Sequence, residues 1–437
     1  MKTSLARSTS TVTWLLIIPT LAWYYVGLFA TMALWYPAGL STSAWQEHLI
    51  HFSIIYLLWL TVFFSYHLFD WDALRTTQAF LGRLVAALLI CLVIAVIYFY
   101  FQPALLLTPR RFLLVHVFIT GVGITLWYTV MRAAASRASR RHVFIHHSIA
   151  ESGQVEYLLN HNKFRGLQYA GKLNDFPSEN LPGRSVVIVA SGAGLSPEES
   201  RLLFDLRNHG VQFVEYHQLY EDLTRTVHLS VLTDMWFIHS IDYSAHQLFD
   251  IAKRGIDILL GLLSIVIFLA TYPIIGLLVK ISSSGPVFFK QQRISQNGKI
   301  FTLYKYRTMT MGGANDTWTA PKDSRITRIG KALRVLRLDE LPQSLNILKG
   351  EMSIVGPRPE QVNIVKELSE QIPYYNERHI VKPGLTGWAQ LHVYAGNLEE
   401  TKRKLQYDLY YIKHRSLLFD LEIILKTVYN IITFAGR

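Results

Sequence analysis

The sequence LDELPQ (residues 338–343) sets two adjacent carboxylates beside a proline, and GEMSIVGPRP (residues 350–359) follows shortly after it. A proline is tolerated in the first turn of a helix, because its missing amide would have no partner there. We therefore predict a short helix over residues 341–348 that stops at Gly350. The free amides and the positive dipole end at its start can bind a phosphate, which points to phosphoryl-group chemistry.

The two carboxylates, Asp339 and Glu340, suit complementary roles. An aspartate can attack phosphorus and form an acyl phosphate once the repulsion between the anions is removed. Mg²⁺ bridging the phosphates would remove it, and Glu340 is a hard oxygen ligand suited to hold that ion. Arg358, fixed between Pro357 and Pro359, can make bidentate contacts to phosphate oxygens. Singly, these features are usually a helix cap and a turn, but their close succession favours a catalytic site.

A dense group of cations precedes and borders the acidic pair. The alternation of aromatic and basic residues in YKYRTM (residues 304–309) predicts a strand with Lys305 and Arg307 on one face, which can bind a diphosphate. The cations of the group are Lys290, Arg293, Lys299, Lys305, Arg307, Lys322, Arg325, Arg328, Lys331, Arg334 and Arg337.

The composition is that of a membrane protein. Of the 437 residues, 51% are hydrophobic and only 17% are charged, which is too apolar for an ordinary soluble chain. The net charge of +12 suits anionic partners such as lipid headgroups or nucleotides. Nucleic acid is disfavoured, because the cations lie between apolar segments and no recognised binding motif accompanies them. The single cysteine, Cys91, excludes an intramolecular disulfide and a cysteine metal cluster.

Four apolar runs open the chain, each close to the roughly 20 residues that a helix needs to cross a bilayer. They lie at residues 14–36, 49–69, 80–101 and 112–131. We predict four transmembrane helices, with the first retained rather than cleaved as a signal peptide. Basic residues cluster before the first run, at Arg75 and at residues 132–141, so both ends of this bundle should face the cytoplasm.

Strand-like and helical patterns alternate after residue 141, which predicts a small parallel α/β domain. The strand-like runs are residues 142–145, 185–190 and 211–215, and a helical pattern covers 197–209. The turn after the first run, residues 146–150, lacks the glycines that a dinucleotide site needs. We expect a degenerate Rossmann-like domain with a structural or regulatory role, and a surface turn rather than a metal site at His146-His147.

A fifth apolar run, residues 258–279, carries Pro273 and has basic residues on both flanks. The flanks place both ends in the cytoplasm, and the proline permits a sharp break. We predict a re-entrant helical hairpin over residues 256–279, with a fifth true span or a buried soluble helix as alternatives. The last apolar segment, residues 417–434, mixes charged and apolar residues and is predicted to be an interfacial helix.

Several of these motifs together resemble the bacterial sugar transferases, the polyprenyl-phosphate hexose-1-phosphate transferases. The resemblance covers residues 249–434 and is carried by SGPVFFKQQR (284–293), YKYRTM (304–309), RITRIG (325–330), LDELPQ (338–343), MSIVGPRP (352–359) and KPGLTGWAQ (382–390). Four spans followed by a degenerate α/β domain resemble the large members of that family. Two residues depart from its usual pattern: Arg337 stands where many members have Ser or Thr, and Ser295 where many have Gly.

The resemblance implies transfer of a hexose 1-phosphate from a UDP-sugar, with UDP-glucose as the first guess, to undecaprenyl phosphate with release of UMP. It implies that Asp339 forms a phosphosugar intermediate, that Glu340 binds Mg²⁺ and that residues 357–359 hold phosphate. The supporting cations would be Arg293, Lys305, Arg307, Arg328, Arg334 and Arg337. It also implies a bacterial inner-membrane protein whose catalytic domain faces the cytoplasm and starts the assembly of an exopolysaccharide, capsule or O-antigen.

The predicted fold is therefore a membrane protein of mixed α and α/β class. Residues 1–135 form the four-helix membrane domain, residues 136–245 the Rossmann-like domain and residues 246–437 a mainly helical catalytic domain on the re-entrant helix. Two other functions stay open, namely direct attack of the lipid phosphate without a covalent step, and a non-catalytic membrane scaffold or sensor. The α/β domain is also a candidate surface for a homodimer.

Overall fold

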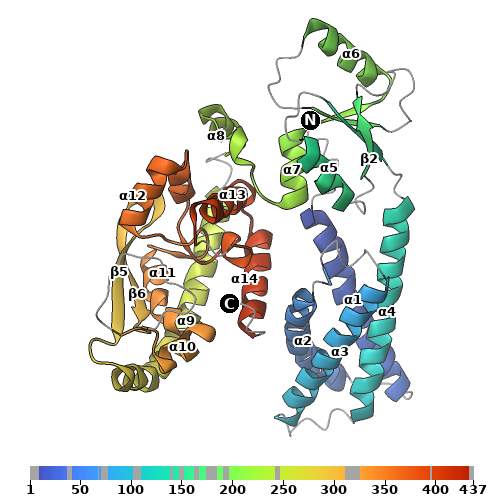
Figure 1. Ribbon diagram of the computed structural model, residues 1–437. Helices are drawn as coiled ribbons and strands as arrows, with labels where there is room; N and C mark the ends of the chain where they lie inside the picture. Colours follow the sequence, from blue (N-terminus) through green and yellow to red (C-terminus); the bar gives the residue numbers. More distant parts are fainter. Residues whose placement is uncertain are drawn as a thin grey trace. The chain divides into compact units, whose positions relative to one another are not determined.

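The chain forms two compact units, Met1–Thr224 and Arg225–Arg437 (Figure 1). The computed structural model describes residues 9–36, 42–66, 68–69, 77–101, 110–137, 141–146, 152–161, 167–173, 185–189, 196–241, 247–310, 325–393 and 396–432. The predicted domain boundary after residue 245 differs from this division. Val227, Leu232 and Ile241 are buried in the core of the second unit, so this segment belongs to that unit.

Four long helices begin the first unit: α1 (Thr9–Trp35), α2 (Thr42–Ser65), α3 (Thr77–Tyr100) and α4 (Arg110–Arg137). They coincide with the four predicted apolar runs, and each is long and apolar enough to cross a membrane. Their shared core is aromatic, with Tyr24 stacked on Tyr56 and Trp59 stacked on His116. Large apolar side chains also remain exposed on the outside of the helices, as expected of surfaces that face lipid.

A four-stranded parallel sheet follows in the order β2-β1-β3-β4. The strands are β1 (Arg141–Ile145), β2 (Leu167–Lys172), β3 (Val186–Val189) and β4 (Gln212–Glu215), and the helices are α5 (Ser152–His161), α6 (Pro197–Asn208) and α7 (Tyr216–Thr224). The three predicted strands and the predicted helix are confirmed. The mixed sequence of β2 was not recognised. The surface-turn prediction is wrong for His146, which is buried and whose backbone amide donates to the Ile188 carbonyl; His147 lies outside the described residues.

The second unit begins with η5 (Leu229–Val231), α8 (Asp234–Ser240), α9 (Gln247–Ser282), β5 (Phe288–Ile294), η6 (Gln296–Gly298), β6 (Ile300–Tyr306) and α10 (Arg328–Val335). It continues with η7 (Leu338–Gln343), α11 (Ser344–Lys349), β7 (Ser353–Val355), α12 (Val362–Gln371), η8 (Tyr375–Ile380), β8 (Gly384–Thr386), η9 (Ala389–Leu391), α13 (Leu398–His414) and α14 (Leu417–Ile432). Strands β5 and β6 form an antiparallel hairpin, and β7 and β8 a parallel pair.

Helix α9 runs for 36 residues and stays helical through Pro273, whereas the sequence predicted a hairpin with a break there. The same unit supports the helix on both sides of the proline. In its first third, Asp257 accepts a hydrogen bond from the backbone amide of Ile354 in β7. Further along, Phe268 and Ile275 are buried in one cluster with Tyr306 of β6. These flanking contacts hold the helix in line although the proline removes one backbone hydrogen bond.

Candidate active site

The acidic pair lies in the first turn of a helical segment made of η7 and α11. The predicted helix is confirmed, but it begins at Leu338, earlier than expected. Arg337 precedes it in the left-handed region with φ of 56°, and Gly350 ends it with φ of 83°. Both carboxylates are buried, at 7% exposure each. The Glu340 amide donates to the Arg337 carbonyl, so the turn at Arg337 fixes the direction in which the pair enters the helix.

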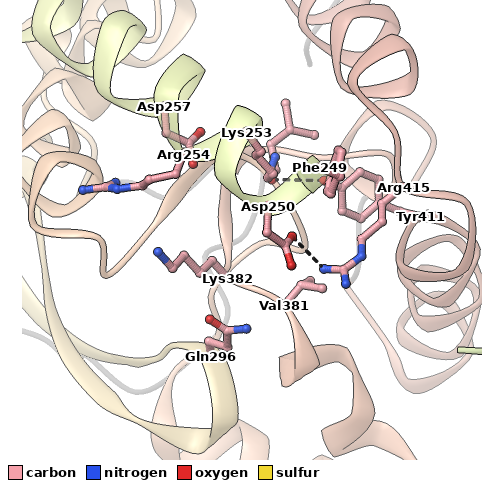
Figure 2. Close-up of a pocket in the computed structure, with 11 residues that line it drawn as sticks. Phe249, Asp250, Lys253, Arg254, Asp257, Gln296, Val381, Lys382, Tyr411 and Arg415 are labelled. Atoms are coloured by element: carbon pink, nitrogen blue, oxygen red, sulfur yellow. Dashed lines mark hydrogen bonds and ion pairs between the residues drawn. The ribbon is translucent and has the colours of Figure 1, made fainter. Parts of the chain in front are cut away.

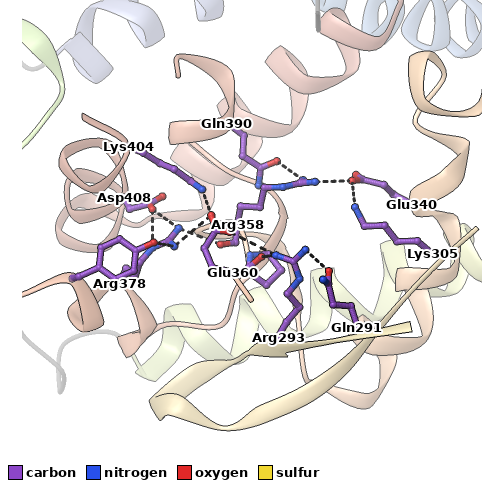
Figure 3. Close-up of polar contacts among 12 residues, drawn as sticks. Gln291, Arg293, Lys305, Glu340, Arg358, Glu360, Arg378, Gln390, Lys404 and Asp408 are labelled. Atoms are coloured by element: carbon purple, nitrogen blue, oxygen red, sulfur yellow. Dashed lines mark hydrogen bonds and ion pairs between the residues drawn. The ribbon is translucent and has the colours of Figure 1, made fainter. Parts of the chain in front are cut away.

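Glu340 is surrounded by cations (Figure 3). Its Oε1 atom accepts hydrogen bonds from Lys305 Nζ at 3.0 Å and Arg358 Nη2 at 3.2 Å, and its Oε2 atom lies 3.7 Å from Arg337 Nη1. Burial would raise the pKa of Glu340, but these three cations together hold it well below its usual range. The Glu340 carboxylate is therefore a fixed anion at neutral pH.

Asp339 has a different environment from its neighbour. Among the described residues, none makes a hydrogen bond or an ion pair with its carboxylate within the usual distances. Burial raises the pKa of Asp339, the adjacent charge of Glu340 raises it further, and the more distant Lys305, Arg334 and Arg358 lower it in part. A buried carboxylate that is near cations but bonded to none of them has its lone pairs available for attack on an electrophile.

The Pro-Arg-Pro segment presents Arg358 to this pair. Its Nη1 atom donates to Gln390 Oε1 at 3.4 Å while Nη2 contacts Glu340, so the guanidinium bridges η7 and η9 (Figure 3). The Pro357 carbonyl accepts from the Gly384 amide at 2.8 Å. Gly384 has no room for a β-carbon, which would stand 2.1 Å from the Gly356 nitrogen. The glycines of the two loops thus allow the close approach that positions Arg358.

A buried ionic network, which the sequence did not predict, supports this segment from behind. Glu360 pairs with Lys404 and lies 3.8 Å from Arg378, which is itself bound to Asp408 at 2.7 Å. The Arg378 guanidinium also donates to the Arg358 carbonyl at 3.1 Å. In the sequence, only the position of Glu360 directly after the Pro-Arg-Pro segment could have indicated this network. Its partners Lys404 and Arg378 come from elements far along the chain, so no local pattern reveals them.

The predicted cations do not form a single binding face. Lys305 reaches the acidic pair, but Arg307 turns to the end of α9, where its Nη2 atom donates to the Ser283 carbonyl at 2.7 Å. The prediction of a shared diphosphate face is therefore wrong. Arg293 donates to the Pro359 carbonyl at 3.0 Å and so supports the motif rather than facing Asp339. Arg334 binds Thr308 Oγ1 at 2.9 Å, and Arg328 is exposed at the start of α10.

The donor set of the acidic pair fits a magnesium ion that is completed by substrate. No group of three or more His, Cys, Asp or Glu side chains forms a metal cage in the described part of the chain. Mg²⁺ is normally held by one or two carboxylates together with phosphates rather than by such a cage. Asp339 and the Oε2 atom of Glu340 accept no hydrogen bond from any described residue, so both could serve as ligands.

The chain is similar to known proteins over the residues that include Asp339 and Glu340. Residues 248–434 match the family model described as bacterial sugar transferase. Over 187 residues the chain is 43% identical to UDP-N-acetylgalactosamine-undecaprenyl-phosphate N-acetylgalactosaminephosphotransferase of Aeromonas hydrophila, covering 42% of this chain and 44% of the relative. Over 184 residues it is 41% identical to UDP-glucose:undecaprenyl-phosphate glucose-1-phosphate transferase of Escherichia coli (strain K12), covering 41% and 39%.

These two matches span less than half the length of either relative. A shorter relative, Exopolysaccharide production protein PSS of Rhizobium leguminosarum bv. phaseoli, is matched almost throughout, with 36% identity over 192 residues, 42% of this chain and 96% of the relative. All of the matched residues of the family model lie in the second compact unit, which carries Asp339 and Glu340. The chain belongs to the bacterial sugar transferase family.

Proposed function

We propose that the protein transfers a hexose 1-phosphate from a UDP-sugar to undecaprenyl phosphate and releases UMP. The observation that carries the proposal is the contrast between the two carboxylates: Glu340 is bound by cations, while Asp339 is buried beside them without a hydrogen bond to any described residue. The names of the relatives add the donor and the acceptor, a UDP-sugar and undecaprenyl phosphate.

The reaction proceeds in two displacements at one phosphorus. The Asp339 carboxylate attacks the phosphorus that bears the sugar, an oxygen–phosphorus bond forms, and the bond to UMP breaks. A phosphate oxygen of the lipid then attacks the same phosphorus and displaces Asp339, which leaves the diphosphate-linked lipid sugar. Lys305 and Arg358 stabilise the negative charge that builds up on the phosphoryl oxygens. Arg337 lies directly before the acidic pair and adds its positive charge beside Glu340.

Mg²⁺ is part of this proposal. Glu340 would hold it, and it would neutralise phosphate oxygens when bound. The protein's own contribution is to keep Glu340 ionised through Lys305, Arg337 and Arg358 and to keep the Asp339 oxygens free of other donors.

The membrane arrangement of the second unit also belongs to the proposal. Five described helices are long and apolar enough to cross a membrane, and α9 is one of them. We infer that α9 enters the membrane without crossing it, because contacts at Asp257, Phe268 and Val279 tie its start, middle and end to one unit. Its other face is apolar and exposed. The catalytic site would then lie near the phosphate of a membrane-embedded lipid, on the cytoplasmic side of the bacterial inner membrane.

Helix α14 supports the same arrangement. Its acidic residues Asp420 and Glu422 point inward and pair with Lys253 and Arg225. Apolar side chains such as Leu418, at 49% exposure, face outward. An interfacial helix on lipid has this distribution of side chains. The degenerate α/β domain is proposed to regulate or support catalysis and to offer the homodimer surface.

The hexose is tested directly, because two relatives at similar identity name different sugars. Purified full-length protein in detergent is assayed for UMP release with undecaprenyl phosphate, Mg²⁺ and a panel that includes UDP-glucose and UDP-N-acetylgalactosamine. Release with one sugar that is abolished by Asp339→Asn supports the proposal. Phosphosugar trapped on a peptide containing Asp339 supports the covalent route, and turnover without it favours direct attack by the lipid. A folded protein without turnover on any sugar favours the scaffold function.

A further inference from the structure

A second cluster of charged side chains lines a cavity of about 270 Å³ at the start of α9 (Figure 2). The charged residues around it are Asp250, Lys253, Arg254, Asp257, Lys382 and Arg415. The cavity lies at the end of α11 where Gly350 terminates the helix, whereas Asp339 lies at the opposite end of the η7–α11 segment. None of the residues assigned to the active site lines this cavity.

Most of these charges have partners inside the unit. Lys253 binds Asp420 at 2.6 Å, and Arg415 lies 3.4 Å from Asp250. The Asp257 carboxylate accepts hydrogen bonds from the hydroxyl of Ser353 and from the backbone beside it. Two cations remain that no carboxylate neutralises within hydrogen-bond or ion-pair distance in the described part of the chain, Arg254 and Lys382.

These two cations lie close together. The Arg254 guanidinium donates to the carbonyls of Ile347 and Leu348 at 2.7 and 2.8 Å, which are neutral acceptors. Lys382 has no hydrogen bond or ion pair with any described residue. Arg254 Nη2 and Lys382 Nζ both stand 3.6 Å from the point that a β-carbon on Gly350 would occupy, so they are at most twice that distance apart. Burial, and then the charge of Arg254, lower the pKa of Lys382, while Asp257 and Asp250 raise it in part.

We propose that this cavity binds the phosphate of an anionic phospholipid headgroup between Lys382 and Arg254. Asp257, which accepts only from neutral donors, offsets one of the two positive charges. A phosphate offers oxygens to both cations at once, and it would neutralise the positive charge that remains. Its volume of about 270 Å³ can hold a phosphate with its attached headgroup. The lipid source is favoured over free phosphate because Leu248 and Ile251, 83% and 70% exposed, begin the apolar face of α9 beside it.

The proposal depends on membrane association and is independent of the transferase chemistry, so its test measures occupancy rather than turnover. The full-length protein is reconstituted in phosphatidylcholine nanodiscs alone, with phosphatidylglycerol, or with added inorganic phosphate. The rate at which an amine-reactive reagent acylates Lys382 is followed by peptide mass spectrometry. Lys366, exposed on α12, is the internal reference.

Phosphatidylglycerol at ten times its Kd should slow acylation of Lys382 about tenfold relative to Lys366. Inorganic phosphate at the same concentration should not. Native mass spectrometry should also show that Lys382→Gln retains one phosphatidylglycerol fewer than either the wild type or Lys366→Gln. Equal Lys382 rates under all conditions would overturn the assignment of the site to an anionic phospholipid, and equal protection by inorganic phosphate would overturn its assignment to lipid.

Discussion

Replacing the two adjacent carboxylates one at a time should change the stability of the second unit in opposite directions. Glu340→Gln removes the charge that Lys305 and Arg358 bind at 3.0 and 3.2 Å. Lys305 and Arg358 then donate to a neutral amide, and two partly buried cations lose their counter-ion, which costs about 2–3 kcal/mol. For a unit of this size the transition should fall by roughly 4–12 °C.

Asp339→Asn should instead stabilise the folded state at neutral pH. Because burial and Glu340 raise the pKa of Asp339 in the folded protein, the folded state binds its proton more tightly than the unfolded state does. Wild-type stability is therefore lost as the pH rises from the ordinary aspartate pKa through the raised one. Asparagine resembles the protonated acid and avoids this loss, so the transition temperature of Asp339→Asn should lie above that of the wild type at neutral pH.

The assay is scanning calorimetry of the full-length protein in detergent across a pH series, with Glu370→Gln as a surface control, since Glu370 is exposed on α12. The advantage of Asp339→Asn should be present above the raised pKa and disappear below the ordinary one. The control should stay within about 0.5 kcal/mol of the wild type. A loss of stability in Asp339→Asn equal to that in Glu340→Gln would refute the unequal environments of the two carboxylates.

Three further predictions follow from the same geometry. Asp408→Asn leaves the buried guanidinium of Arg378 without its carboxylate at 2.7 Å and should destabilise the unit by about 3 kcal/mol, as measured by calorimetry. It should also lower kcat of UMP release, because the Pro-Arg-Pro segment is displaced. An unchanged kcat would contradict the positioning role of this ion pair. Gly330→Ala should lower the transition temperature by several degrees, because its β-carbon would stand 2.1 Å from the Thr308 carbonyl oxygen, and an unshifted transition would exclude that close contact. Arg328→Gln should leave KM for the UDP-sugar within about twofold of the wild type in the UMP assay, since this side chain is exposed and bonded to no described residue. A KM increase of tenfold or more would show that Arg328 binds the substrate.

Local sequence determined the helices and the acidic motif. The four apolar runs recur as α1 to α4, since a continuous apolar stretch of that length has few other stable conformations in a membrane protein. The end of α11 at Gly350 and the strands β1, β3 and β4 were predictable for similarly local reasons, a left-handed glycine and short runs that contain β-branched and aromatic residues. Each of these features depends on neighbours within a few residues.

Only the tertiary structure decided which cations meet the carboxylates. Lys305 and Arg307 are two residues apart, yet one bonds Glu340 and the other the end of α9, because the strand β6 ends at Tyr306 and the chain turns away. The network of Glu360 with Lys404 and Arg378 joins segments far apart in sequence, so no local pattern could reveal it. Burial made the same difference for the acidic pair. The sequence places Asp339 and Glu340 side by side. Only the packing of distant segments gives Glu340 two cationic hydrogen-bond partners and leaves the Asp339 carboxylate with no hydrogen bond from a described residue.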